Sequence, residues 1–173
     1  MMKKILLFIL ALFNYCTYAQ SFQWVNSVGD SGIYHGVRGN SIKTDGLGNS
    51  YITGYFTDTT DFDGGPGVFN LLTPKNTSNV FVLKLNSSGD FVWAKNMNGS
   101  SGVGLSLAID PSGNIYTTGT FGGVVDFDPG PGTYTISEST PGAVNTFISK
   151  LDPSGNFVWA KSIGGMGDTY GRG

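Results

Sequence analysis

Two Asp-Phe-Asp segments are the residues of this sequence whose types and spacing are best suited to chemistry. Asp61 and Asp63 precede Gly-Gly-Pro-Gly, and Asp126 and Asp128 precede Pro-Gly-Pro-Gly. In an extended chain the two carboxylates of a pair point to the same side, about 7 Å apart at a rise of about 3.3 Å per residue. Carboxylates beside backbone carbonyls are the hard oxygen ligands that Ca²⁺ prefers. These four acids are therefore candidate calcium ligands.

A structural turn is the alternative for the same two segments. A calcium loop normally supplies a further carboxylate at short spacing, and neither segment has one. Phe62 and Phe127 separate the acids and have the size and polarity of core anchors. Asp followed by glycine and proline is also typical of tight turns. The sequence therefore leaves calcium binding and turn formation both open.

Other catalytic signatures are weak. The single histidine, His35, has almost no glutamate or cysteine to combine with, so neither a histidine-containing metal site nor a catalytic triad is expected. The segment around Ser106 lacks the second glycine of a nucleophile elbow and begins a predicted strand. Ser149, Asp152 and Trp159 have some features of the Asp-box hairpin of sialidase propellers, but their spacing departs from it. We therefore expect no enzyme, with a glycan hydrolase or lyase as the alternative.

Residues 1–19 predict a secretory signal peptide. Residues 1–4 are a short basic start, residues 5–13 are apolar, and residues 17–19 offer small residues before a cleavage site after Ala19. The apolar run is too short to span a bilayer, so we expect secretion (extracellular, cell-surface or periplasmic) and no membrane span. Cleavage removes Cys16, so the mature chain, residues 20–173, is expected to contain no disulfide.

The charge balance argues against nucleic acid as a partner. The sequence has 10 Lys and Arg against 12 Asp and Glu. Removing the two lysines of the signal peptide leaves 8 basic and 12 acidic residues, a net charge of −4. Binding to nucleic acid needs clustered Lys and Arg, and the sequence has no such cluster. The 27 glycines and the predominance of Asp over Glu favour turns rather than helices.

A repeat of about 65 residues organises the chain. Residues 84–95 and 150–161 are two copies of one strand–turn–strand segment, and Asp45 recurs 65 residues later as Asp110. Each period contains four predicted strands. They are Ser41–Thr44, Ser50–Phe56, Val80–Leu85 and Phe91–Met97 in the first copy and Ser106–Ile109, Ile115–Phe121, Thr146–Leu151 and Phe157–Ile163 in the second.

Four antiparallel strands per period are typical of a β-propeller blade that carries one long loop. The third strand of each copy is apolar on both faces, as expected for a strand that is covered on both sides. We therefore predict an all-β fold of two four-stranded blades, with a two-sheet sandwich as the alternative. The predicted blades cover about residues 41–99 and 106–165, with a leading strand at 22–28 and a truncated third repeat at 166–173.

Two blades are too few to close a ring, because propellers typically have four to eight. We therefore expect a partial propeller, completed by further blades in a longer chain or by homo-oligomerisation. The three tryptophans, Trp24, Trp93 and Trp159, occupy one fixed place in the repeat. Because tryptophan recurs at the same position of each repeat, we predict that the three side chains anchor one blade on the next and do not form a surface on which sugars stack.

The second copy resembles a known family of repeats. Its motifs are Asp-Pro-Ser-Gly-Asn-Ile-Tyr at 110–116, Asp-Phe-Asp-Pro-Gly-Pro-Gly at 126–132 and Asp-Pro-Ser-Gly-Asn-Phe-Val-Trp-Ala-Lys at 152–161. They are similar to the β-propeller repeats called SBBP (seven-bladed β-propeller), and the likeness covers essentially all of the mature chain. The resemblance implies a large secreted bacterial protein, often of Bacteroidota, for which biochemical roles are mostly unassigned.

These observations predict a secreted β-propeller scaffold or binding module whose partner is an unknown protein or glycan. Loops on a rigid scaffold are a usual place for recognition sites. The long segments Asp61–Asn79 and Asp126–Asn145 are where we expect that site. The alternative is part of a polysaccharide-active propeller enzyme, which predicts hydrolysis that Asp128→Asn abolishes.

Overall fold

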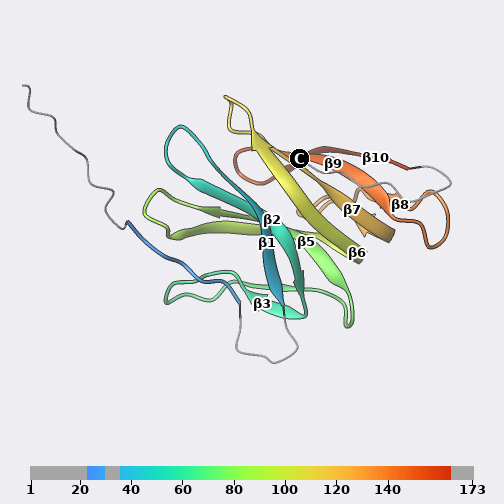
Figure 1. The fold of residues 1–173 in the computed structure, drawn as a ribbon, viewed down its shortest axis with the longest axis horizontal. Coiled ribbons are helices and arrows are strands. Elements are labelled where there is room, and N and C mark those ends of the chain that lie inside the picture. Colours follow the sequence, from blue (N-terminus) through green and yellow to red (C-terminus); the bar gives the residue numbers. More distant parts are fainter. Residues whose placement is uncertain (1–22, 30–35, 165–173) are drawn as a thin grey trace, which may run out of the picture.

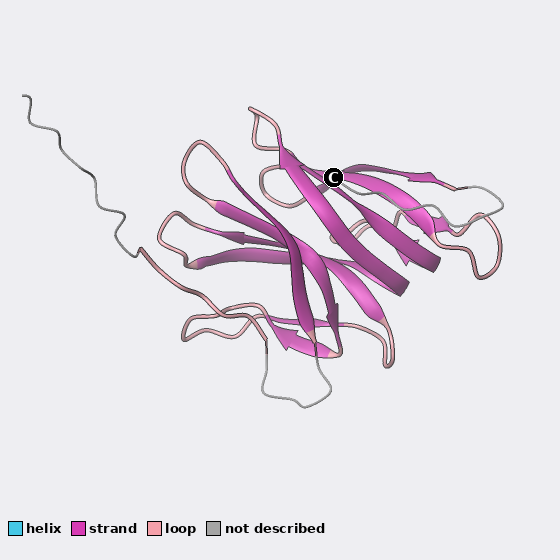
Figure 2. Ribbon diagram, viewed as in Figure 1, coloured by secondary structure: helices cyan, strands magenta, loops and turns pink. Residues whose placement is uncertain are grey.

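Strands make up all the regular structure in the part of the chain that the structure describes, residues 23–29 and 36–164 of a computed structural model (Figures 1 and 2). The strands are β1 (Val37–Thr44), β2 (Ser50–Thr57), β3 (Thr59–Asp61), β4 (Asn70–Leu72), β5 (Ser78–Leu85), β6 (Phe91–Ile109), β7 (Ile115–Asp126), β8 (Thr135–Ser137), β9 (Asn145–Leu151) and β10 (Phe157–Ile163). Over these residues no helix is long and apolar enough to cross a membrane. The predicted signal peptide, His35 and the predicted third repeat at 166–173 lie outside the described residues.

Two antiparallel four-stranded units follow one another along the sheet, whose order is β1-β2-β5-β6-β7-β9-β10. The long strand β6 belongs to both units, because its residues 91–97 pair with β5 and its residues 98–109 pair with β7. We call β1, β2, β5 and residues 91–97 blade 1, and residues 98–109, β7, β9 and β10 blade 2. The predicted all-β fold is thus confirmed. In the described residues the two blades form an open segment, as a partial propeller does.

One type of tight turn joins neighbouring strands in both blades. It recurs at residues 45–49, 86–90, 110–114 and 152–156, and in each case the N–H of the fourth residue donates to the carbonyl of the first. That fourth residue is always a glycine, with φ between 79° and 85° in Gly48, Gly89, Gly113 and Gly155. Residues with a Cβ rarely adopt this left-handed conformation, which explains the glycine in every copy.

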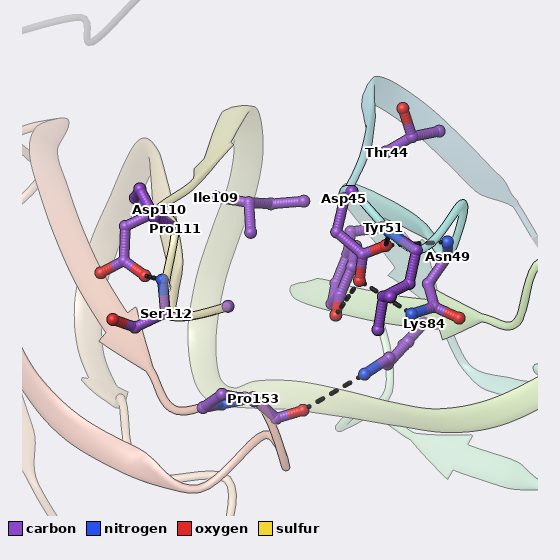
Figure 3. Close-up of a pocket in the computed structure, with 13 residues that line it drawn as sticks. Thr44, Asp45, Asn49, Tyr51, Lys84, Ile109, Asp110, Pro111, Ser112 and Pro153 are labelled. Atoms are coloured by element: carbon purple, nitrogen blue, oxygen red, sulfur yellow. Dashed lines mark hydrogen bonds between the residues drawn. The ribbon is translucent and has the colours of Figure 1, made fainter.

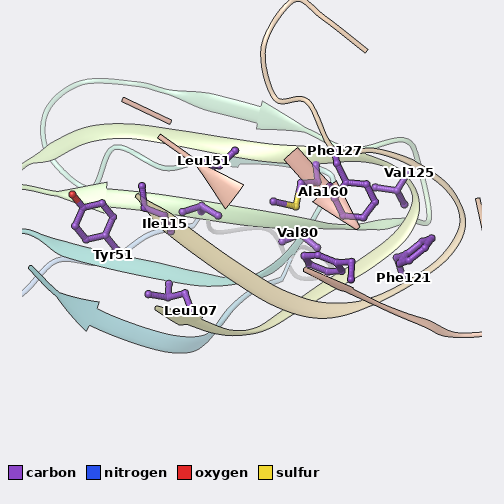
Figure 4. Packing of buried hydrophobic residues seen from close by; sticks show 12 residues of the cluster. Tyr51, Val80, Leu107, Ile115, Phe121, Val125, Phe127, Leu151 and Ala160 are labelled. Atoms are coloured by element: carbon purple, nitrogen blue, oxygen red, sulfur yellow. The ribbon is translucent and has the colours of Figure 1, made fainter. Parts of the chain in front are cut away.

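The main hydrophobic core lies between the two blades (Figure 4). Blade 1 contributes Tyr51 and Val80, and blade 2 contributes Ile115, Phe147 and other buried side chains. The central strand β5 is buried on both faces for five consecutive residues, as its apolar sequence predicts. Burial of both faces is expected when a sheet is covered by neighbours on each side.

The segments between the second and third strands of each blade are more ordered than predicted. We expected long loops over 61–79 and 126–145, whereas β3 pairs with β4 and β8 pairs with the end of β7. The reason is that Phe62 and Phe127 are fully buried and tie each segment to the core. We call residues 58–77 and 126–144 the insertions of blade 1 and blade 2.

Residues 23–29 lie against blade 1, but they do not form the leading strand that the sequence predicts at 22–28. Trp24 and Val28 pack against a second cluster of buried side chains in blade 1. Asn26 Nδ2 donates to the carbonyl of Gly89 at 2.9 Å, and the N–H of Gly29 donates to the carbonyl of Asp61 at 3.2 Å. A strand needs a hydrogen-bonded neighbour, and no described strand pairs with this segment.

Candidate functional site

The first acid of each Asp-Phe-Asp segment closes its loop by accepting two backbone hydrogen bonds. Asp61 Oδ1 accepts from the N–H of Asp63 at 3.0 Å and from that of Phe69 at 2.8 Å. In blade 2, Asp126 Oδ1 accepts from the N–H groups two and eight residues later at the same two distances. Each carboxylate therefore joins the two ends of an eight-residue loop.

The second acid of each segment caps the bend that follows it. Asp63 Oδ1 accepts from the N–H of Gly65 at 2.9 Å, and Asp128 Oδ1 accepts from that of Gly130 at 2.8 Å. The other oxygen of Asp63 lies so close to Gly67 that a Cβ there would approach it to 2.1 Å. The carboxylates thus hold a glycine-rich bend in place, which is the turn role that the sequence left open.

In the structure only the first acid of each pair belongs to a strand. Asp61 is the last residue of β3 and Asp126 the last of β7, while Asp63 and Asp128 lie in irregular loops. Within residues 23–29 and 36–164, no three His, Cys, Asp or Glu side chains gather in an arrangement that could hold a metal ion. Calcium binding at these four acids stays a prediction.

Calcium binding at the Asp-Phe-Asp loops predicts that a chelator lowers the melting temperature of the protein. A bound ion stabilises only the folded state, in proportion to RT ln(1 + [L]/Kd). The measurement is thermal unfolding with excess EDTA and then with added calcium, and Asp63→Asn with Asp128→Asn is the variant that should remove the effect. An unchanged melting temperature at saturating EDTA would contradict calcium binding.

Three of the tight turns, at 45–49, 110–114 and 152–156, contain a second set of carboxylates that are held by hydrogen bonds. Asp110 Oδ1 accepts from the N–H groups of Ser112 and Asn114, both at 2.9 Å. Its Oδ2 accepts from Asn114 Nδ2 at 2.7 Å and from the hydroxyl of Tyr116 at 3.2 Å. Asp45 is held in the same way in blade 1, with Tyr51 as its hydroxyl donor. Each turn therefore stabilises its aspartate in the ionised form.

These hydrogen bonds lower the pKa of three turn aspartates below the ordinary value of 3.8. For Asp110 the hydrogen bond from Asn114 is the largest cause of the lowered pKa. For Asp45 and Asp152 partial burial raises the pKa, but the hydrogen bonds that each accepts outweigh it, so the pKa of each is also lowered. The carboxylates are therefore charged in the folded protein at neutral pH.

Acid should destabilise the protein through these turns. Because the folded-state pKa values lie below 3.8, the stabilisation is fully present above that pH and is lost as the pH falls through the folded-state pKa. Urea unfolding at several pH values from neutral to strongly acidic would measure this loss. Because the asparagine of Asp110→Asn cannot ionise, this variant should lose less stability than the wild type as the pH falls. Equal or greater stability below pH 3.8 would contradict the expectation.

A cavity of about 660 Å³ lies between the two blades at the end where the tight turns lie (Figure 3). Its walls include the turn that begins at Asp45, the turn that begins at Asp110, and the side chains of Tyr51 and Lys84. Lys84 Nζ lies 5.0 Å from the centre of the Tyr51 ring and 3.5 Å from the carbonyl oxygen of Pro153. One lysine thus connects the two blades. Sequence reasoning did not identify this cavity, because it depends on how the blades pack.

The insertions present apolar side chains to solvent, and the two blades do so in matching positions. Phe69 packs at a tilt against Phe91 with 4.9 Å between ring centres, and Tyr134 packs in the same way against Phe157 at the same distance. Phe69 and Tyr134 are both 38% exposed. Val68 and Leu72 of blade 1 are more exposed still. We call Val68, Phe69, Leu72 and Tyr134 the outer rim.

The residues with weak hydrolase signatures do not assemble into a catalytic arrangement. Ser149 is fully buried, and its hydroxyl lies 4.0 Å from Met97 Sδ. Asp152 holds the turn before β10 through hydrogen bonds to Ser154 and Asn156. That the protein is not an enzyme stays a prediction.

Comparison with known proteins gives a partial match to a repeat protein. No family model matches the chain. The chain is 31% identical over 110 residues to an uncharacterized WD repeat-containing protein of Acanthamoeba polyphaga mimivirus. The match covers 51% of this chain and 8% of the viral protein, so the chain spans only a small part of that relative's length.

WD repeats form the four-stranded blades of β-propellers, and the same four-stranded units are seen here. The chain is a β-propeller-like repeat protein. This confirms the repeat-propeller part of the sequence interpretation. Repeat proteins of this kind are suited to interaction with other proteins, because each blade adds surface to a rigid scaffold.

Proposed function

We propose that this protein is a secreted β-propeller binding module of the SBBP type, from a bacterial source, and that it binds an extracellular protein or glycan through the outer rim. The observation that supports this is the repeated exposed aromatic residue on each insertion. Phe69 and Tyr134 each pack against a phenylalanine of the blade's outer strand and stay 38% exposed. Exposed aromatic side chains on a rigid support are enriched among residues that contribute most to binding.

Three features of the insertions support a binding role. Their buried phenylalanines fix them to the core, so little order has to be gained on binding. Carboxylate hydrogen bonds close their loops, so the loop shape is fixed before a partner arrives. The partly exposed apolar side chains of the outer rim lie beside polar glycine-rich loops, which is the composition of interaction surfaces rather than of catalytic centres.

The experiment is a screen of the purified protein against arrays of extracellular proteins and glycans, with product analysis on any glycan that binds. Saturable binding without release of shorter glycan products supports the binding module. Release of products that Asp128→Asn abolishes would favour the enzyme alternative instead, because Asp128 is the acid for which that alternative predicts a catalytic role.

A further inference from the structure

The cavity between the two blades is large enough to hold a ligand and is walled by described residues of both blades. Its volume is about 660 Å³, within the range of about 300–1,000 Å³ that is typical of small-ligand sites. Blade 1 supplies the turn at 45–49 and Lys84, and blade 2 supplies Ile109, Pro153 and the turn at 110–114 (Figure 3). None of the outer-rim residues lines it. The cavity is therefore a surface separate from the outer rim.

Leu47 is an exposed apolar side chain at a place where the other tight turns carry serine. The third residue of the turn is Leu47 in the first turn and a serine in the other three, Ser88, Ser112 and Ser154. Leu47 is 82% exposed and lines the cavity. On the blade 2 wall, Ile109 stands at the place that Thr44 takes in blade 1. Each wall thus has an apolar residue where the repeat elsewhere has a hydroxyl group, which favours an apolar partner.

Lys84 brings hydrogen-bond donors into the cavity that the protein itself uses poorly. Its Nζ lies 3.5 Å from the carbonyl oxygen of Pro153, farther than the distance of about 2.7–3.2 Å usual for an N–H···O hydrogen bond. An ammonium group has three N–H donors, and among the described residues this oxygen is its one acceptor. A ligand oxygen beside Lys84 would therefore accept a better hydrogen bond than the protein offers.

Two carboxylates restrict the charge of such a ligand. Asp45 and Asp110 line the cavity, and each accepts four hydrogen bonds within its own blade. Both are ionised at neutral pH, so they repel an anion that would otherwise pair with Lys84. A cation is disfavoured as well, because Lys84 repels it and the carboxylate oxygens already have their donors. The cavity therefore favours an uncharged group that accepts a hydrogen bond.

An uncharged peptide segment meets these conditions better than a sugar does. Each residue of a peptide brings one carbonyl acceptor and one N–H donor together with its side chain. A sugar ring brings several hydroxyl groups, and each one that is buried without a partner costs free energy. The side chains of Leu47, Ile109 and Pro153 would leave such hydroxyl groups without partners, whereas they would cover an aliphatic side chain.

We infer that this cavity is a second binding site, which takes an apolar side chain of an uncharged peptide segment from a partner protein. The side chain lies between Leu47 and Ile109, and the neighbouring peptide carbonyl accepts a hydrogen bond from Lys84. Asp45 and Asp110 exclude acidic segments. The hydrogen bonds of the turns hold the walls in place before binding, so little order has to be gained.

The test is an NMR titration of the purified, isotope-labelled full-length protein with pools of N-acetylated, C-amidated tripeptides. One pool is apolar and uncharged, one is acidic and one is basic, and a neutral disaccharide is titrated separately. With the apolar pool we expect saturable shifts of the backbone amide signals of residues 45–49, 84 and 109–113. The acidic and basic pools should bind at least about tenfold more weakly, because each meets a like charge in the cavity.

Two substitutions in the cavity should weaken binding of the apolar pool. Leu47→Ser gives the first turn the serine of the other three turns and should cost about tenfold in affinity, since it removes an apolar contact. Lys84→Met removes the ammonium group, keeps most of the length of the side chain and should also cost about tenfold. The control is Val158→Ser, because this valine is 46% exposed on β10 and does not line the cavity.

The inference would be overturned if the apolar pool gave no saturable shifts, or if a charged pool or the disaccharide bound more tightly. It would also be overturned if Leu47→Ser and Val158→Ser had equal effects, since the peptide would then bind elsewhere. If Lys84→Met fails to fold, the comparison between these two variants still decides, because both change exposed side chains. The outer rim is unchanged in all of these proteins, so either result leaves the proposed function to be tested separately.

Discussion

Replacing Phe127 by alanine is expected to lower the free energy of unfolding by about 3–5 kcal/mol, the usual loss for a buried phenylalanine. The side chain is fully buried, and its ring lies 5.5 Å from that of Phe121 and 5.0 Å from that of Phe147. It is also the residue that ties the insertion of blade 2 to the core. Urea unfolding followed by tryptophan fluorescence measures the change.

Phe62→Ala should give a loss of similar size, because the same contacts recur in blade 1. There the ring centre of Phe62 lies 5.2 Å from that of Phe56 and 5.0 Å from that of Phe81. Tyr134→Ala is the matched control, since this aromatic residue of the blade 2 insertion, which also holds Phe127, is 38% exposed and its loss should cost much less. Losses below about 1 kcal/mol for both phenylalanines would contradict the assignment of these residues as core anchors.

Gly119→Val is the second substitution with a large expected effect, a loss of about 3 kcal/mol or the failure to fold. Gly119 pairs with Gly104 where β6 and β7 run side by side next to an irregularity in the register. A Cβ on Gly119 would lie 2.0 Å from the carbonyl oxygen of Val103 and 2.9 Å from the ring of Phe147. Neither the backbone nor the packed ring can move away without separating the two strands.

The control for this substitution is Gly46→Ala, because nothing lies within 4 Å of a Cβ at that position. It should leave the melting temperature nearly unchanged. Gly54→Val should behave like Gly119→Val, since a Cβ on Gly54 would lie 1.8 Å from the carbonyl oxygen of Arg38. A Gly119→Val protein that melts at the temperature of Gly46→Ala would show that these strands are not packed as described.

The repeat made most of the strands predictable from the sequence. Each of the eight strands expected in the blades is present, because runs of apolar, β-forming residues and the Asp- or Asn-x-x-Gly turns between them fix both ends of a hairpin. The prediction that tryptophans anchor one blade on the next is confirmed for Trp93, which packs on Gly155, and Trp24 makes the same contact with Gly89. What the repeat could not show is that residues 91–109 form one continuous strand.

The insertions were harder to predict because glycine and proline dominate their sequences. Such composition is typical of irregular loops, and the anchoring effect of Phe62 and Phe127 depends on where the chain folds back. The roles of the aspartates could not be predicted either, since a carboxylate that caps a bend and one that binds an ion look alike in sequence. The outer rim was missed because the exposure of Phe69 and Tyr134 follows from the rings that they pack against rather than from their own type.

The affinity of outer-rim variants for the ligand found by array screening tests the proposed binding function most directly. The variant is Phe69→Ser with Tyr134→Ser, and the control is Val158→Ser, which changes a side chain 46% exposed on β10. We predict that the rim variant binds at least about tenfold more weakly, as expected when aromatic residues central to an interface are removed, while the control binds like the wild type. Equal affinity of all three proteins, with melting temperatures unchanged, would contradict the proposed binding surface.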